Sequence, residues 1–247
     1  MLTTFLALLT AHLISDFFLQ TEWMVARKKE PAILLLHIAI TVVAAAVTLG
    51  GTPIPILAIL AVTHLFVDAI KTHLLKDSLR SFLADQLAHL IVIVGLCWLY
   101  PTTFHDWWWP HWLATSQLPY YLAGLCLASG IILNLLVGAI LIRKMTTQFT
   151  LQIRDNIRGL EKGGYYIGLL ERGLVMLFIL INQPAGVGFL ITAKSILRFG
   201  DVKNSTQRRS TEYIIIGTFM SFGWSFLIAV LTQNAIKHWL PGLQSNQ

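Results

Sequence analysis

Three pairs of potential metal ligands, whose partners are four positions apart, lie in segments that are otherwise apolar enough to cross a membrane. They are His12/Asp16, His64/Asp68 and Asp85/His89. Four residues is just over one helical turn, so both members of a pair project from the same helix face. An ionisable group at the centre of a membrane costs about 2.5–3.5 kcal/mol on insertion scales. Six such groups therefore indicate a compensating role, either coordination of a cation or pairing around a polar substrate.

Imidazole and carboxylate suit zinc, iron, manganese or cobalt, and the lack of thiolates among them argues against copper(I) or an iron–sulfur cluster. His37, at the start of the next apolar segment, is a further ligand or a general base. Seven potential ligands exceed the three or four that one tetrahedral zinc needs, which permits two divalent metal ions. Gln20, Lys71 and Gln86 accompany these ligands as supporting residues. The alternative is that each His–Asp pair is a hydrogen-bonded structural pair inside the membrane.

A second set of charged residues lies in the C-terminal part of the chain and has different chemistry. It comprises Glu171, Arg172, Lys194, Arg198 and Glu212. We expect the three basic residues to bind an anionic group such as phosphate, and the two glutamates to orient them. Adjacent helical residues point about 100° apart, so Glu171 and Arg172 are not expected to pair with each other. The alternative is a buried ion-pair network that fixes helix packing.

The composition determines the class of protein. Of the 247 residues, 55% are hydrophobic and only 12% are charged, whereas soluble domains carry about 25% charged residues. This excludes a water-soluble domain and predicts an all-α, polytopic membrane helix bundle whose partners include membrane lipids. The net charge of +6 comes from loops between spans, so it indicates membrane topology and not nucleic-acid binding.

The chain contains about eight apolar segments near the 17–25 residues that a spanning helix needs. They cover residues 2–20, 33–49, 54–75, 82–100, 118–142, 166–182, 185–199 and 213–236. The seventh is marginal in length. Fifteen of the 18 Lys and Arg residues follow the odd-numbered segments. By the positive-inside rule those loops are cytoplasmic, which predicts that both termini lie outside and that the His/Asp ligands lie in the cytoplasmic leaflet.

The predicted organisation has five parts. Residues 1–100 form a four-span N-terminal half, in which the repeated His-x-x-x-Asp motif suggests a two-span duplication. Residues 101–117 form an external loop rich in Trp, as in an aromatic belt, with ligand binding as the alternative. Residues 118–142 are the fifth span, and residues 143–165 a basic amphipathic segment on the cytoplasmic surface that Gly163 and Gly164 end. Residues 166–247 form the C-terminal three-span half.

The motifs HLISDFFLQ, HLFVDAIK, DQLAHL, GLLERG, AKSILRF and EYIIIGT together resemble a bacterial multi-pass membrane family, domain of unknown function 3307. The resemblance implies a multi-helix protein of the bacterial inner membrane and supplies no established activity. The sequence contains no H-E-x-x-H helix and no P-loop.

Three functions remain in competition. The first is a metal-dependent hydrolase acting on a lipid or lipid-linked phosphate, with the His/Asp set holding one or two metals and the basic residues binding the headgroup. The second is an ion- or proton-coupled transporter of a small solute, in which buried His and Asp carry protons or bind substrate. The third is a non-catalytic membrane scaffold.

Overall fold

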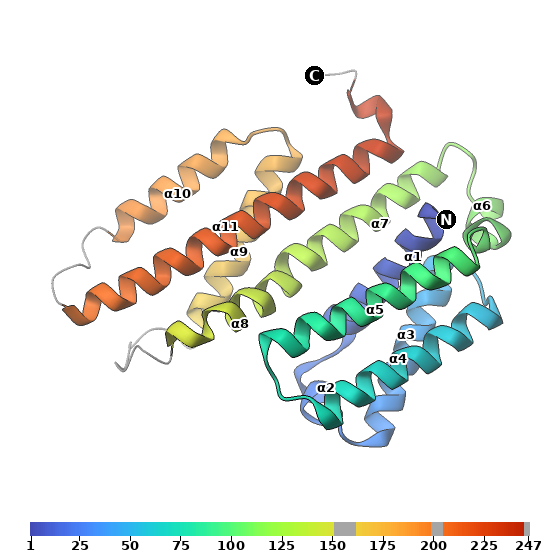
Figure 1. The fold of residues 1–247 in the computed structure, drawn as a ribbon. Helices are drawn as coiled ribbons and strands as arrows, with labels where there is room; N and C mark the ends of the chain where they lie inside the picture. The colour runs from blue at the N-terminus through green and yellow to red at the C-terminus, as the bar shows by residue number, and fades with distance from the viewer. Residues whose placement is uncertain (151–161, 199–204, 245–247) are drawn as a thin grey trace. The chain divides into compact units, whose positions relative to one another are not determined.

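In a computed structural model, the described residues are 1–150, 162–198 and 205–244, and their regular elements are all helices (Figure 1). Seven of these helices are long and apolar enough to cross a membrane. They cover Leu2–Leu19, Pro31–Leu49, Ile54–Leu74, Leu79–Leu99, Leu118–Thr147, Gly163–Leu180 and Thr211–Trp239. The predicted all-α membrane bundle is therefore confirmed.

The predicted seventh span is the helix α10 (Ala185–Arg198). Its 14 residues give a length of about 21 Å, which is less than the roughly 30 Å of a hydrocarbon core. It pairs with the preceding helix α9 (Gly163–Leu180). The structure thus supports seven candidate spans and one shorter apolar helix, and the outward orientation of both termini stays a prediction.

The chain divides into two compact units. Unit 1 contains Met1–Ile132 and Ala235–Gln247, and unit 2 contains Leu133–Asn234. The fifth predicted span contributes α7 (Leu118–Ile132) to unit 1, and the π-helix η3 (Leu133–Val137) and α8 (Gly138–Thr150) to unit 2. The last helix, α11 (Ser205–Trp239), also contributes to both units. The five-part segmentation made from the sequence stays a prediction.

Four helices of unit 1 pack in a closed ring. They are α1 (Leu2–Leu13), which continues as the π-helix η1 (Ile14–Leu19), α3 (Pro31–Leu49), α4 (Ile54–Leu74) and α5 (Leu79–Leu99). Helix α1 contacts α3 and α5, and α4 contacts the same two helices. Helix α7 packs against α1, where the hydroxyls of Thr10 and Ser129 lie 2.8 Å apart. Leu8, Leu49, Ile56 and Leu96 are among the buried side chains. This ring positions the candidate site.

The two ends of unit 1 are closed differently. At one end lies the short helix α2 (Glu22–Ala26), whose N-cap Thr21 accepts a hydrogen bond from the Met24 amide. At the other end lie η2 (Thr103–Asp106) and α6 (Trp108–Trp112) of the Trp-rich segment (Figure 1). The Trp109 indole donates to the Val47 carbonyl at 2.8 Å. It also lies so close to Gly50 that a Cβ there would be 2.3 Å from the ring, which explains the glycine.

The basic segment after the fifth span is described only in part. Helix α8 carries Arg143 and Lys144 and continues to Thr150, while residues 151–161 lie outside the described part of the chain. Gly163 and Gly164 are the first residues of α9, and the predicted surface segment before them stays a prediction. Lys162 caps that helix in the left-handed conformation, with φ 59°.

Candidate metal centre

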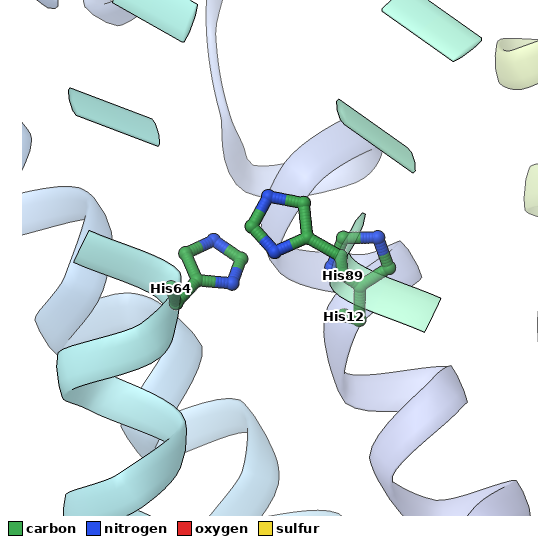
Figure 2. A group of neighbouring side chains, drawn as sticks. All are labelled: His12, His64 and His89. Carbon is green, nitrogen blue, oxygen red and sulfur yellow. The ribbon is translucent and has the colours of Figure 1, made fainter. Parts of the chain in front are cut away.

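One histidine from each of the four ring helices points into the middle of unit 1. They are His12 from α1, His37 from α3, His64 from α4 and His89 from α5, and all four are buried. The ring centroids of His64 and His89 are 4.1 Å apart, and those of His12 and His89 are 4.9 Å apart. Figure 2 shows these three imidazoles as close neighbours on separate helices. The His37 ring lies 5.2 Å from that of His64.

Three carboxylates join the imidazoles. Asp16 Oδ1 lies 3.5 Å from His37 Nε2 and 3.4 Å from His64 Nε2. Asp68 Oδ2 lies 3.2 Å from His37 Nε2, and Asp85 Oδ1 lies 3.6 Å from His89 Nε2. Members of each predicted pair therefore also lie close to side chains on other helices. The structure brings all seven predicted ligands together in one buried polar site.

A helix distortion positions Asp16. The residue lies in η1, where the α-helical repeat of α1 changes to a π-helix. Such π-turns alter the direction of side chains within a span and are frequent at functional sites. The Ser15 hydroxyl, which is fully buried, donates to Asp16 Oδ1 at 3.0 Å. This hydrogen bond helps to hold the carboxylate toward His37 and His64.

Two lysines hydrogen-bond to the carboxylates of the site. Lys28 Nζ donates to Asp68 Oδ1 at 2.8 Å, and Lys71 Nζ donates to Asp85 Oδ2 at 2.5 Å. Lys71 was predicted as a supporting residue. Lys28 was not predicted, because it stands in a run of three basic residues after the first span, a pattern that indicates only membrane topology. In the structure Lys28 is 8% exposed.

The two predicted supporting glutamines behave differently. Gln86 bridges two ligands: its Nε2 donates to Asp85 Oδ2 at 3.0 Å, and its Oε1 lies 3.1 Å from His12 Nε2. Gln20 follows η1, and its buried Nε2 has no hydrogen-bond partner in the structure. Gln86 is thus built into the site, whereas the Nε2 of Gln20 donates to none of its atoms.

Several ligand atoms of the site are buried without a hydrogen bond. They are Asp68 Oδ2, Asp85 Oδ1, His89 Nε2 and His37 Nδ1. Leaving buried polar atoms unpaired is costly, about 1–3 kcal/mol for each group. A cation would satisfy the free lone pairs of both carboxylates and of a neutral imidazole. The donor set therefore fits a divalent metal.

Three groups of three side chains could hold such an ion, with ligand atoms within 4.8 Å of one another in each group. They are His12–His64–His89, Asp16–His37–His64 and Asp68–Asp85–His89. Ligand atoms around a tetrahedral zinc at 2.0–2.1 Å stand roughly 3.4 Å apart. Small side-chain movements would bring any of the three groups to that spacing.

The site is layered along the helices. His64 and His89 are the central residues of the 21-residue helices α4 and α5. Asp68 lies about one turn closer to the C-terminal end of α4, where Lys71 is found, and Asp85 lies about one turn closer to the N-terminal end of α5. The expectation that these ligands lie in the cytoplasmic leaflet stays a prediction.

A small hollow adjoins the imidazole layer. It is lined by His12, His64 and His89, and by the neighbouring side chains Leu60, Thr63, Val92 and Ile93. Thr63 and Val92 are partly exposed. The hollow therefore has an apolar wall of Leu60, Val92 and Ile93 beside Thr63 and the three imidazoles.

The predicted anion-binding residues lie in unit 2. Arg172 is buried, donates from Nη1 to the Ser221 hydroxyl at 3.2 Å, and donates from Nη2 to the Leu135 carbonyl at 3.2 Å. Lys194 pairs with Glu171, with 2.7 Å between Nζ and Oε2. Glu171 and Arg172 thus have different partners, as expected.

The described part of the structure contains only some of the predicted anion-binding side chains. Arg172 and Lys194 are each engaged by other residues of unit 2. The side chain of Arg198 lies outside the described part of the structure, and Glu212 is exposed on α11. Binding of an anion by these residues stays a prediction.

The ligands of unit 1 repeat along the sequence more fully than the His-x-x-x-Asp motif indicated. A spacing of 52 positions separates His12 from His64, Asp16 from Asp68 and His37 from His89. The distances repeat as well. His12 lies 3.5 Å from Asp16 and His64 lies 3.6 Å from Asp68, while the His37–Asp16 and His89–Asp68 distances are 3.5 and 3.9 Å. Asp85 has no such counterpart, since position 33 is Ile.

Residues 4–114, which include all seven ligands and both lysines, match the family model described as protein of unknown function (DUF3307). This region is a domain of that family. The predicted resemblance, drawn from six motifs, is confirmed for residues 4–114, which hold the first three. The motifs GLLERG, AKSILRF and EYIIIGT lie beyond the match, and a bacterial origin stays a prediction. The chain has no match among the curated proteins or among the solved structures.

Proposed function

We propose that this protein is a metal-dependent hydrolase that acts within the membrane on a lipid or a lipid-linked phosphate. The observation that carries the proposal is the buried set of four imidazoles and three carboxylates, four atoms of which have no hydrogen-bond partner. Each potential group supplies three protein ligands. Catalytic zinc sites typically have three protein ligands and keep a fourth position for water or substrate.

The bound metal would supply a hydroxide at neutral pH and polarise a phosphoryl oxygen. Zinc, manganese and iron all suit this mixture of imidazole and carboxylate. His37 is better placed as a ligand than as the general base, because its Nε2 lies within 3.5 Å of both Asp16 and Asp68 and it does not line the hollow. His12 does line the hollow, and Gln86 holds its Nε2. We therefore assign the general base to His12.

The apolar wall of the hollow supports a lipid substrate. Val62 and Phe66 on α4 and Ile91 and Val94 on α5 are large exposed hydrophobic residues near the hollow-lining positions. In a membrane protein such residues face lipid. The hollow has no room for a water molecule, so side chains near the partly exposed Thr63 and Val92 would have to move apart for a lipid-linked phosphate to reach the imidazoles. The proposed location is the bacterial inner membrane, and the basic residues of unit 2 are proposed to bind anionic headgroups.

Metal analysis of detergent-purified protein tests the first half of this proposal. We expect stoichiometric divalent metal in the wild type and less metal in Asp16→Ala and in Asp68→Ala. The exposed Asp106, changed to Ala, is the matched control and should keep the wild-type metal content. Folded wild-type protein that takes up no zinc, manganese or iron would refute the metal centre.

Release of phosphate tests the second half. The metal-loaded protein in mixed micelles should liberate phosphate from at least one member of a panel of phosphatidic acids, lipid diphosphates and polyprenyl phosphates. His12→Gln should lower the turnover while retaining the metal. Metal-loaded protein without turnover on the whole panel would count against hydrolysis and favour the alternative below.

Transport of a cation is the second candidate, and the central position of His64 and His89 in their helices favours it. Parallel repeats around a buried polar site are also common in transporters. Proteoliposomes loaded with a metal-sensitive dye separate the two functions. Zinc or manganese influx that His64→Ala abolishes would establish transport, and tight binding without flux would support the enzyme.

A further inference from the structure

The three potential ligand groups do not compete equally for side chains. His12–His64–His89 shares a residue with each of the other two groups, whereas Asp16–His37–His64 and Asp68–Asp85–His89 have no residue in common. Two cations can therefore be held at once only by the latter two groups. We name them the histidine-rich site (Asp16, His37, His64) and the aspartate-rich site (Asp68, Asp85, His89).

The unpaired atoms point to the aspartate-rich site as a second place for an ion. Asp68 Oδ2, Asp85 Oδ1 and His89 Nε2 all lack a hydrogen bond, and these side chains are only 1–3% exposed. One atom without a hydrogen bond thus comes from each member of this group, although Asp85 Oδ1 and His89 Nε2 lie within 3.6 Å of each other and Asp68 Oδ2 lies 3.2 Å from His37 Nε2. The internal sequence repeat does not explain this set of three atoms, since Asp85 has no counterpart in the first repeat.

The lysines are distributed unequally between the two sites. Lys28 donates to Asp68 and Lys71 donates to Asp85, so both ammonium groups belong to the aspartate-rich site. Asp16, the carboxylate of the histidine-rich site, accepts instead from the Ser15 hydroxyl. Two carboxylates and two ammonium groups sum to zero charge. One divalent cation would neutralise the same two carboxylates.

We propose that the centre holds two unequal cations: a retained one in the histidine-rich site, and an exchangeable one in the aspartate-rich site that displaces the ammonium groups of Lys28 and Lys71. This rests on the proposed metal centre and adds the number of ions, their order of binding and the residues that control the second one. Exchange of two monovalent ammonium groups for one divalent ion leaves the charge of the buried site unchanged. The exchange therefore avoids the large cost of a net charge inside the membrane.

The lysines are placed so that they can leave. Lys71 has a side chain that is 32% exposed, and Lys28 belongs to the connection between α2 and α3 at the end of the bundle. Long lysine side chains readily extend toward the interface while the stem stays in apolar surroundings. Their departure would uncover the carboxylates from the same end.

The two sites should prefer different ions. Two imidazoles and one carboxylate suit zinc, whereas two carboxylates and one imidazole shift the preference toward manganese. Zinc is therefore the probe for the histidine-rich site, and manganese, which is visible by electron paramagnetic resonance, is the probe for the aspartate-rich site.

Metal titration of the chelator-treated full chain in detergent tests the proposal. One equivalent of Zn²⁺ is added first, and Mn²⁺ is then titrated and followed by paramagnetic resonance. We expect one further equivalent of Mn²⁺ to bind. Its affinity should rise about tenfold in Lys28→Met and, separately, in Lys71→Met, because a charge-assisted hydrogen bond no longer competes with the ion. Lys29→Met, an exposed neighbour, is the matched control and should equal the wild type.

Ligand variants distinguish the two sites. Asp68→Asn should lose Mn²⁺ and keep one Zn²⁺, while Asp16→Asn should lose the tight Zn²⁺. If Asp68→Asn and Asp16→Asn both lose every ion, the centre is a single site and the two-site proposal is overturned while the metal centre stands. Unchanged Mn²⁺ affinity in both Lys28→Met and Lys71→Met would overturn the displacement by lysine. A wild-type chain that binds neither ion would overturn the metal centre as well.

Discussion

The polar site of unit 1 and the Arg172 cluster of unit 2 both lie at a π-helix, but they serve different purposes. Each lies at a π-helix inside a candidate span, η1 for Asp16 and η3 for the residues around Arg172. A π-helix breaks the regular backbone ladder, so it changes side-chain directions and frees a carbonyl for other donors. In unit 2 the carbonyls of Leu133 and Leu135, both in η3, accept from Trp224 and Arg172.

The difference lies in what the buried polar groups still lack. Arg172 is a cation held by neutral acceptors, and its Nε and the Oδ1 of Asn134 are a donor and an acceptor left over. In unit 1 the unpaired atoms are mostly lone pairs of carboxylates and imidazoles. A buried polar cluster therefore indicates a metal site when some of its oxygen or nitrogen lone pairs accept no hydrogen bond. It indicates a role in fixing helix packing when backbone carbonyls hydrogen-bond to its charged group.

The largest expected effect is the loss of a ligand in unit 1. Asp16→Ala should lower the affinity for the first Zn²⁺ more than 100-fold, since loss of mere second-shell partners already costs 10–100-fold. Glu171→Ala removes a carboxylate from unit 2 and should leave Zn²⁺ binding unchanged. Isothermal titration calorimetry measures both, and an equal loss in the two variants would erase the contrast between the units.

Metal removal should destabilise the protein through unit 1. An ion that binds only the folded chain, present at 100 times its Kd, adds about 2.7 kcal/mol to the free energy of unfolding. Thermal unfolding in detergent should show a higher Tm with Zn²⁺ than with a chelator. The aspartate-rich site does not include His64, so the shift should shrink in His64→Ala and persist in full in Ser221→Ala. A full shift in His64→Ala would contradict the assignment.

The Arg172 cluster should show the opposite behaviour. Arg172→Met leaves the Leu135 carbonyl without its donor and should lower the free energy of unfolding by about 2 kcal/mol, with Zn²⁺ affinity unchanged. Lys194→Met breaks a partly exposed ion pair and should cost at most about 1 kcal/mol. Thermal unfolding ranks the two variants. Weaker Zn²⁺ binding in Arg172→Met would show that this cluster serves the metal site.

The smallest effect should distinguish the two glutamines. Gln86→Leu removes the bridge between His12 and Asp85 and should weaken metal binding about tenfold. Gln20→Leu should leave binding within error, because the buried Nε2 of Gln20 has no hydrogen-bond partner to lose. Titration with Zn²⁺ and Mn²⁺ measures both variants, and equal effects would remove the distinction between the two glutamines.

Much of the site could be predicted because helical spacing is a local property. His64 and Asp68 share a helix face at any position in a bundle, and the hydropathy of the segments identified the spans that carry them. Lys28 could not be found in this way. Whether a basic residue between spans faces water or folds back onto Asp68 depends on the conformation of α2 and its connection, which no periodic pattern encodes.

The length of α10 and the roles of the tryptophans show the same limit. The apolar run 185–199 gave a marginal span, and the structure has a helix of 14 residues there. Trp109 was expected at the membrane interface, yet its indole packs on Gly50 and bonds to Val47. Composition predicts that an aromatic residue prefers an interface, but it cannot say whether that interface is lipid or another helix end.

The sequence by itself determined the membrane class, the spans and the face from which each ligand projects, because hydropathy and the helical repeat act over short distances along the chain. Only the tertiary structure decided that four helices close into a ring with one imidazole each, and that two lysines neutralise two of the three carboxylates. The physical reason is that unpaired charges and lone pairs are costly away from water. Which partner relieves that cost depends on contacts between residues far apart in the chain.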